Sequence, residues 1–269
     1  MGARLGQHFL KHGWAAAKLA HAVPLVAGEV FLEIGPGKGV LTKELLKLGP
    51  VVAIEKDEVL AENLKQIFSS DITAGRLKLI TGDIRDFKPE TYDLKSGTYI
   101  VAANIPYYIT GEIIRQFLTA EHQPRAMALL VQKEVADRIV AKNDKESILS
   151  ISVKAYGAPR IVGKVGKSHF SPPPSVDSAI LVIDDISKRF FSDVSEDDFF
   201  DLVHRGFASK RKMLSRNLAS SFELRASRSA MQRCGIPEKA RAEDVSLEQW
   251  KCLTTDLSNL NARRSHLST

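Results

Sequence analysis

The first two-thirds of the chain alternate short apolar runs with amphipathic helical patterns, and this alternation is the strongest constraint on the fold. Apolar runs that predict buried strands lie at residues 30–34, 51–54, 77–80, 99–103 and 127–131. Helical patterns lie at residues 41–48, 57–68, 110–118 and 133–141. Strands separated by helices form βαβ units and a mainly parallel sheet, so the predicted fold class is α/β. Residues 151–156 and 179–183 are further strand or core candidates.

The pattern changes after residue 183. Helical patterns follow at residues 196–207, 211–221, 225–234 and 247–257, with almost no strand-like alternation. We therefore predict one domain over residues 1–186 and a small all-helical domain over residues 187–269. The stretch from residue 186 onward holds 15 Lys and Arg against 11 Asp and Glu, within a net charge of +6 for the chain. A positive excess of this kind favours an anionic partner such as RNA.

Composition narrows the classes of protein further. A length of 269 residues suffices for one α/β domain and a smaller appendage. No apolar run approaches the roughly 20 residues that cross a bilayer, and no apolar signal-peptide core is present near the start. We therefore expect a cytoplasmic protein without membrane contact. Cys234 and Cys252 match no metal-binding spacing, so we expect two reduced thiols and no metal site.

Polar and glycine-rich motifs follow the ends of three successive predicted strands. The loop after the first strand reads EIGPGKG, and Gly35 and Gly37 allow a sharp turn and close approach of a ligand. Glu55 ends the second strand, where a carboxylate can accept both hydroxyls of a ribose. Asp83 ends the third and can accept a hydrogen bond from an adenine amino group. Each residue alone also fits a turn or a solvated acid, but the series favours an adenosine-containing cofactor.

The tetrapeptide Asn104-Ile105-Pro106-Tyr107 follows the fourth predicted strand. The lone pair of an adenine N6 amine is delocalised into the ring, so a site that methylates it must hold the amine by its hydrogens. The side-chain carbonyl of Asn104 and the backbone carbonyl of Ile105 are suitable acceptors. Pro106 biases Ile105 towards an extended conformation, and Tyr107 offers a ring on which a base can stack. A nicotinamide dehydrogenase would share Gly35, Gly37 and Glu55 but has no use for this tetrapeptide. The alternative for the tetrapeptide itself is a turn without a functional role.

Together these motifs resemble the ribosomal RNA adenine dimethyltransferase family over nearly the whole chain. The resemblance implies a Rossmann-like class I methyltransferase sheet that uses S-adenosylmethionine (SAM) as cofactor. The GQHFL stretch near the start matches the family motif that closes over the cofactor, with His8 where relatives often carry Asn. The SAM-binding residues that the resemblance implies are Gln7, His8, Leu10, Gly35, Gly37, Glu55, Lys56, Asp83, Ile84 and Asn104.

Two later motifs carry the resemblance towards RNA. The stretch FSPPPSVDS begins at Phe170, whose ring is implied to hold the target adenine against Tyr107; a plug in the core is the alternative. The catalytic residues are then the tetrapeptide and Phe170. The segment Arg205–Leu214 resembles the family's basic C-terminal helix, and a solvated helical face is its alternative. The phosphate contacts that it implies are Arg205, Lys210, Arg211, Lys212 and Arg216.

The resemblance also implies a substrate. Members that act on the small subunit dimethylate two adjacent adenosines in a hairpin loop near the 3′ end of 16S rRNA, so we expect immature 30S subunits as partner and a monomeric enzyme. The two later motifs favour this branch. One alternative is a large-subunit rRNA adenine N6-methyltransferase of the antibiotic-resistance type. Another is an RNA-binding assembly factor that needs no catalysis.

Overall fold

The computed structural model describes residues 8–11 and 13–267. The chain divides into two compact units, Met1–Asp137 with Gly157–Ser187 and Arg138–Tyr156 with Lys188–Thr269. The second unit therefore includes residues 138–156 in addition to the C-terminal region. None of the helices in the described ranges is long and apolar enough to cross a membrane.

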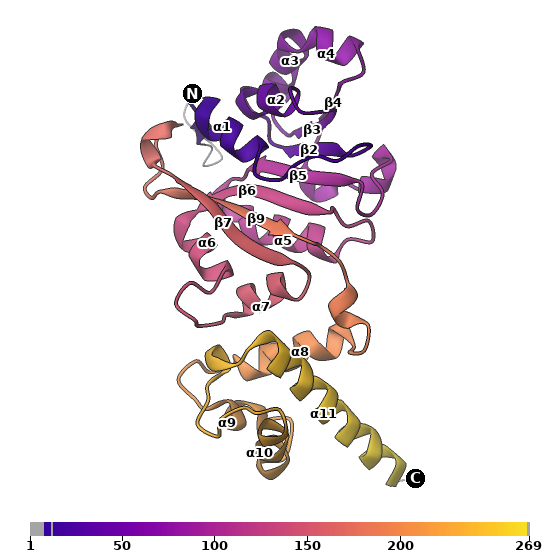
Figure 1. The fold of residues 1–269 in the computed structure, drawn as a ribbon, viewed down its shortest axis with the longest axis vertical. Helices are drawn as coiled ribbons and strands as arrows, with labels where there is room; N and C mark the ends of the chain where they lie inside the picture. The colour runs from indigo at the N-terminus through magenta and orange to yellow at the C-terminus, as the bar shows by residue number, and fades with distance from the viewer. Residues whose placement is uncertain (1–7, 12, 268–269) are drawn as a thin grey trace. The chain divides into compact units, whose positions relative to one another are not determined.

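The first unit is built on a seven-stranded sheet of order β4-β3-β2-β5-β6-β9-β7 (Figure 1). The strands are β2 (Val30–Ile34), β3 (Val51–Glu55), β4 (Leu77–Thr81), β5 (Tyr99–Asn104), β6 (Ala126–Gln132), β7 (Ala158–Val165) and β9 (Ser178–Asp184). Strands β2 to β6 pair in parallel, whereas β9 is antiparallel to both β6 and β7. The five predicted parallel strands and the α/β class are confirmed.

The strand order reverses between β2 and β5. From β2 the chain passes through α2 (Val40–Leu45) to β3 on one side, and from β5 through α5 (Thr110–Thr119) to β6 on the other. Because such crossovers are right-handed, α2 and α5 lie on opposite faces of the sheet. Open α/β sheets bind ligands at this kind of switch point, beyond the carboxyl ends of the strands. The remaining helices here are α1 (Gly13–Ala20), α3 (Glu58–Ile67), α4 (Ser69–Thr73) and α6 (Lys133–Ile139), the last of which continues into the second unit.

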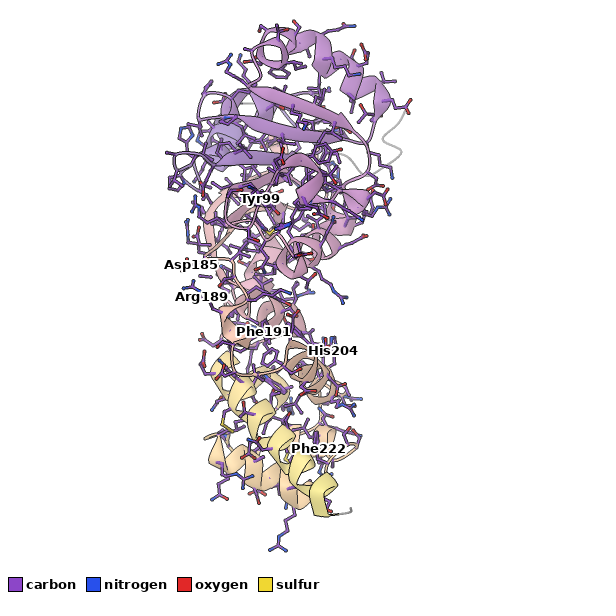
Figure 2. All side chains as sticks on the ribbon, turned by 90° about the vertical axis from the view of Figure 1, so that its right-hand side faces the viewer. Tyr99, Asp185, Arg189, Phe191, His204 and Phe222 are labelled. Carbon is purple, nitrogen blue, oxygen red and sulfur yellow. A yellow bond between two sulfur atoms is a disulfide. The ribbon has the colours of Figure 1, made fainter. Side chains whose placement is uncertain are left out.

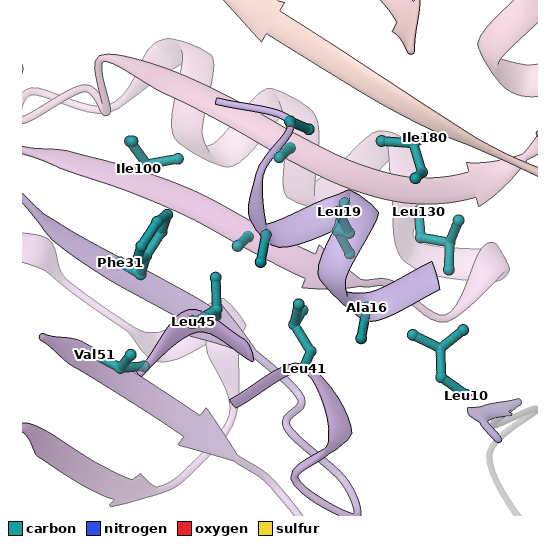
Figure 3. Packing of buried hydrophobic residues seen from close by; sticks show 14 of the residues in the cluster. Leu10, Ala16, Leu19, Phe31, Leu41, Leu45, Val51, Ile100, Leu130 and Ile180 are labelled. Carbon is teal, nitrogen blue, oxygen red and sulfur yellow. The ribbon is translucent and has the colours of Figure 1, made fainter. Parts of the chain in front are cut away.

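The core of the first unit lies between one face of the sheet and helices α1 and α2. Figure 3 shows Phe31 and Ile100 from the sheet beside Leu19 of α1 and Leu45 of α2, all of them buried. Burying a side chain of this size contributes about 1.5–3 kcal/mol. The strands β2, β3, β5 and β6 read as largely apolar runs because both of their faces are covered.

A separate two-stranded pair joins distant parts of the sequence. Strand β1 (Phe9–Leu10) runs antiparallel to β8 (Phe170–Ser171), with Leu10 opposite Phe170. The N–H of Lys11 extends the pairing by donating to the carbonyl of His169 at 2.8 Å. We call this pair the β1–β8 clip. Two-residue strands carry no periodic signal, so the sequence did not predict them.

Two elements differ from the sequence predictions. Residues 151–156 do not form a strand, because Ile148–Lys154 is helix α7, which begins with a capping box between Ser147 and Ser150. The segment ILSISVK alternates apolar and polar residues as a strand would, but the cap selects the helix. The core alternative holds, since Ile151 and Tyr156 are buried. Strand β7 was missed because Pro159 and Gly163 interrupt its pattern, which an edge strand tolerates.

The second unit contains four further helices, and each overlaps a predicted helical pattern. They are α8 (Glu196–Gly206), α9 (Leu214–Leu218), α10 (Leu224–Arg233) and α11 (Leu247–Leu267). A Cβ atom at Gly206 would lie 2.2 Å from the Trp250 ring, so glycine lets α8 approach α11 closely. Helix α8 ends there, and residues 207–213 form a non-helical connection. The basic helix that the resemblance implied over Arg205–Leu214 was therefore wrong.

An aromatic cluster explains why residues 138–156 belong to the second unit. The Tyr156 ring lies 5.2 Å from Phe191, labelled in Figure 2, and 6.0 Å from Phe200. The Tyr156 hydroxyl donates to Glu196 at the start of α8. The backbone N–H of Glu146 donates to the carbonyl of Glu243 at 2.9 Å. The predicted boundary at 186/187 follows chain order, whereas packing brings this internal segment back to the C-terminal helices.

Cys234 and Cys252 form a disulfide, with their Cα atoms 5.8 Å apart. Cys234 directly follows α10 and Cys252 lies in α11, and an ion pair of 2.6 Å between Arg233 and Asp256 joins the same two helices. The expectation of two reduced thiols was wrong. Helix packing brings together the sulfurs of two cysteines that are 18 residues apart in the sequence, and that spacing does not indicate a disulfide.

Candidate active site

A cavity opens at the carboxyl ends of β2, β3 and β5. Its lining residues are His8, Phe9, Gly35, Gly37, Glu55, Asn104, Ile105, Pro106 and Tyr107. A neighbouring cavity shares Phe9, Gly35 and Asn104 and adds Leu10, Glu33 and Lys38. The structure thus brings together most of the predicted cofactor residues and the whole tetrapeptide.

The glycine-rich loop has two separate reasons for its glycines. Gly35 and Gly37 adopt positive φ angles of 64° and 58°, which disfavour residues with a side chain. At Gly37 a Cβ atom would also lie 2.8 Å from the ring of Phe9. The Gly37 N–H donates to Glu55 Oε2 at 2.9 Å, so the loop after β2 is fixed to the end of β3.

Glu55 is 3% exposed and is held by backbone donors. Besides the bond from Gly37, its Oε1 accepts the N–H of Asp57 at 3.0 Å. A carboxylate has about four acceptor positions, so both oxygens can still accept a hydroxyl. This geometry fits the predicted role towards the two ribose hydroxyls of an adenosine.

Asp83 is engaged by two cations. Lys56 Nζ lies 2.8 Å from Asp83 Oδ2, and Arg85 Nη2 lies 2.5 Å from the same oxygen. The Arg85 guanidinium, with a smaller contribution from Lys56, holds the pKa of Asp83 far below its usual range. Asp83, Lys56 and Ile84 are not among the lining residues of the two cavities. Their predicted contacts with the cofactor therefore stay predictions.

The Asn104 amide is oriented by the N-terminal motif. Its Nδ2 donates to the backbone carbonyl of His8 at 2.8 Å, which leaves the side-chain oxygen as the free acceptor. The Tyr107 hydroxyl shares a hydrogen bond of 2.7 Å with Ser178 Oγ, and its ring centroid lies 5.7 Å from that of His8. Burial raises the pKa of Tyr107, so this hydroxyl stays protonated. The acceptor and the stacking ring are both fixed by neighbours.

The β1–β8 clip connects this site to the FSPPPSVDS stretch. His8 Nδ1 lies 2.8 Å from the carbonyl oxygen of Pro172, directly after β8. Phe170 itself is fully buried and belongs to the core cluster, and it does not line either cavity. The structure therefore does not form the predicted sandwich of Phe170 and Tyr107, and its placement matches the alternative of a core plug. Gln7, the remaining predicted SAM contact, lies outside the described residues.

The predicted RNA-binding residues lie around the connection between α8 and α9. All five of them, Arg205, Lys210, Arg211, Lys212 and Arg216, are exposed. Arg205 pairs with Asp201 at 2.6 Å, whereas the other four form no ion pair within residues 8–11 and 13–267. Asn217 Nδ2 holds the first part of the connection by donating to the carbonyls of Gly206 at 2.5 Å and Ser209 at 3.1 Å. A basic loop thus replaces the predicted basic helix.

Sequence reasoning missed Glu33, which lines the neighbouring cavity and is 1% exposed. Neither of its oxygens has a hydrogen-bond partner in the described part of the chain. Burial raises the pKa of Glu33 to about 8. The available signal was an acid inside the otherwise apolar run VFLEI. An unpaired buried carboxyl group beside a cavity suits a cationic ligand group.

Known proteins resemble this chain along nearly its whole length. The model of the family "Ribosomal RNA adenine dimethylase" matches residues 2–258. A "Ribosomal RNA small subunit methyltransferase A" of Dehalococcoides mccartyi is 40% identical over 252 residues, which cover 93% of this chain and 86% of that protein. The protein of the same name from Thermosynechococcus vestitus is 37% identical, covering 96% and 97%.

Solved structures show the same fold. A dimethyladenosine transferase from Plasmodium falciparum superposes with a TM-score of 0.78 at 24% identity, covering 95% of this chain and 98% of its own. The 23S rRNA methyltransferase ErmE gives the same TM-score and identity, covering 93% and 99%. From the family match and these relatives, we conclude that the chain belongs to the ribosomal RNA adenine dimethylase family.

Proposed function

We propose that this chain transfers two methyl groups from SAM to the N6 amine of each of two adjacent adenosines in a hairpin loop near the 3′ end of 16S rRNA. The observation that carries the proposal is the Asn104 amide at the end of β5. His8 engages its nitrogen, which leaves its oxygen as an acceptor beside the glycine-rich loop. That arrangement can hold a planar amine next to a methyl donor.

The residues present fit SAM. The open backbone at Gly35 admits a ligand closely, and the Glu55 carboxylate can accept ribose hydroxyls. The buried carboxyl group of Glu33 offers a partner for the ammonium group of the methionine end. Bound SAM would supply an electrophilic methyl group, and the residues of this chain determine where the acceptor amine lies relative to it.

The tetrapeptide positions that amine. Asn104 Oδ1 accepts one N–H of the adenine amine, and the carbonyl of Ile105 is the second acceptor in this proposal. Tyr107 supports the base by stacking, and its bond to Ser178 keeps the ring in place. Alignment of this kind accounts for the rate without a general base, because the amine becomes acidic once methylated and loses its proton to water.

The names of the curated relatives support the small-subunit substrate over the large-subunit one. The curated relatives with 37–40% identity are named for the small subunit, whereas the large-subunit enzyme ErmE is 24% identical.

We place residues 1–186 in catalysis and residues 187–269 in RNA binding, where the exposed cations of the α8–α9 loop suit phosphates. The proposal includes a monomer that acts on immature 30S subunits in the cytoplasm.

The test is transfer of labelled methyl groups from SAM to immature 30S subunits, followed by mapping of dimethyladenosine in 16S rRNA. Asn104→Ala should lower the rate about 100-fold, the scale on which loss of one hydrogen bond to a reacting group acts. Asn143→Ala, at an exposed asparagine that does not line the cavity, should leave the rate unchanged. Methylation of large-subunit RNA alone would favour the resistance type of enzyme. If no RNA were methylated, the proposal would be wrong.

A role in subunit assembly can coexist with catalysis and is separable from it. Tyr107→Ala removes the stacking ring while leaving the basic loop of the second unit unchanged. If this variant is inactive but still binds immature subunits, binding does not depend on methyl transfer. Loss of both properties together would contradict a separate assembly role.

A further inference from the structure

The chain has two tryptophans with opposite environments. Trp250 is fully buried in the helical unit, whereas Trp14 in α1 is 53% exposed. A large exposed aromatic ring provides a platform for stacking a nucleic-acid base. The proposed function gives Trp14 no role, and its ring does not line either cavity of the active site.

A lysine and a histidine lie beside the Trp14 ring. Lys18 Nζ lies 5.5 Å from the ring centroid, and the His169 ring lies 5.5 Å away. Lys11 is exposed, and its backbone N–H bonds to the carbonyl of His169. We call Lys11, Trp14, Lys18 and His169 the Trp14 patch.

Carboxylates do not neutralise the two lysines of this patch. Neither Lys11 nor Lys18 forms an ion pair with any residue that the structure describes. Glu44 is an acid near the start of α1, 3.7 Å from a Cβ placed on Gly13, but Lys47 pairs with it at 2.7 Å. The patch therefore combines an accessible ring with uncompensated positive charge.

The β1–β8 clip connects the patch to the active site within the first unit. His8 and Phe9 line the cavity, and Lys11 of the patch follows one residue after β1 ends. His169 likewise directly precedes Phe170 of β8. A polynucleotide that delivers one base to Tyr107 can therefore bring a neighbouring nucleotide to Trp14.

We propose that the Trp14 patch binds a single-stranded nucleotide of the substrate RNA that flanks the target adenosine. The base stacks on the exposed face of Trp14, while Lys11 and Lys18 contact adjacent phosphates. Stacking together with cationic contacts is the usual chemistry of single-strand recognition. This inference rests on the proposed function, since it takes the substrate to be RNA.

The test uses the full chain, SAM and an RNA hairpin whose loop contains two adjacent adenosines. Because Trp250 is buried, quenching of fluorescence by acrylamide reports mainly on Trp14, and bound RNA should protect it. Trp14→Ala should raise the Kd for this RNA about tenfold, whereas Trp14→Phe, which keeps a ring, should retain most of the affinity. Lys18→Gln should reduce the slope of log Kd against log salt concentration by about 0.7.

Lys164→Gln is the matched charge control. A Cβ atom at Gly163 would lie 2.5 Å from Lys18 Nζ, so Gly163 faces Lys18. Lys164 is the next residue of β7, is exposed, and points to the opposite face. This variant should bind the hairpin with unchanged affinity and salt dependence.

Two results would overturn the inference. One is wild-type affinity of Trp14→Ala for the hairpin, and the other is unchanged quenching of Trp14 when RNA is bound. Methylation by the wild-type chain distinguishes this failure from failure of the proposed function. If the wild type methylates RNA but Trp14→Ala binds the hairpin with wild-type affinity, only the proposed role of the Trp14 patch is refuted. If the wild type methylates no RNA, the proposed function is refuted. A SAM-induced rise in Tm in each variant verifies that the fold is intact.

Discussion

The Glu33 side chain combines deep burial with the absence of a hydrogen-bond partner among the described residues. Burial raises its pKa to about 8 from the ordinary value of 4.5, and the negative charge of Glu55 adds to this effect while Thr42 opposes it. Near neutral pH the group is therefore mainly protonated in the folded protein. In the unfolded chain it is ionised.

This difference predicts how stability depends on pH. Below pH 4.5 Glu33 is protonated in both the folded and the unfolded state, so it does not change the free energy of unfolding. As pH rises towards 8, the unfolded chain releases a proton that the folded protein keeps, so the free energy of unfolding falls by up to about 4 kcal/mol. Glu33→Gln should remove this contribution. Urea unfolding at pH 5 and pH 8.5 measures it, with exposed Glu121→Gln as the control; equal pH dependence in both variants would contradict the prediction.

Several single residues of the site could be predicted from sequence, and others could not. Gly35, Glu55 and Asn104 were predictable because each directly follows or ends a buried strand, and parallel strands bring their carboxyl ends to one edge of the sheet. Phe170 was assigned to the base because the family resemblance implies that role, with a plug in the core as the alternative. Whether an aromatic ring points inward or outward is decided by tertiary packing, which the motif does not contain.

At the scale of elements, the connection between α1 and β2 is anchored to the start of β6. Glu29 is 5% exposed and pairs with Arg125, which also donates to the carbonyl of Pro24 at 2.8 Å. The Arg125 Nη2 to Glu29 Oε2 distance is 2.9 Å. The pair fixes a loop that precedes the central strand β2.

Removing one partner should therefore cost stability. Arg125→Leu leaves the Glu29 carboxylate buried without its cation and should lower the free energy of unfolding by about 3 kcal/mol. The double variant Glu29→Gln/Arg125→Leu should recover part of that loss, because no unpaired charge remains. Chemical denaturation of the three proteins measures the coupling. A double variant less stable than Arg125→Leu would contradict the account.

Predictability differed between kinds of element for physical reasons. The strands β2, β3, β5 and β6 are largely apolar because both faces are covered, so they stand out in the sequence. Helix α7 was misread as a strand because its apolar and polar residues alternate, whereas the capping box that favours the helix consists of only two serines. The β1–β8 clip and the disulfide depend on contacts between distant segments, and neither leaves a local pattern.

At the scale of the whole molecule, the exposed cations that we assign to RNA binding and the cavity that we assign to SAM belong to different units. Lys210, Arg211 and Lys212 lie in a loop of the second unit, outside the cavity that we assign to SAM. Their combined replacement by Gln should weaken binding of 30S subunits and reduce the salt slope by about 2, since each phosphate contact of a single strand contributes roughly 0.7.

SAM affinity, measured by calorimetry, should not change in the same triple variant. Filter binding of 30S subunits at several salt concentrations gives the slope. If the slope stayed constant, these cations would not contact phosphate, and the predicted role of the loop would be wrong.

The β1–β8 clip determines how much of the chain must be synthesised before the cofactor cavity can form. Residues 8 and 9 line the cavity, but their antiparallel partner strand begins at residue 170 of 269. During synthesis the N-terminal segment emerges long before that partner exists. The cofactor cavity therefore cannot be completed until well over half of the chain has been translated, and a nascent polypeptide cut short before residue 170 carries the glycine-rich loop and the tetrapeptide without a closed site.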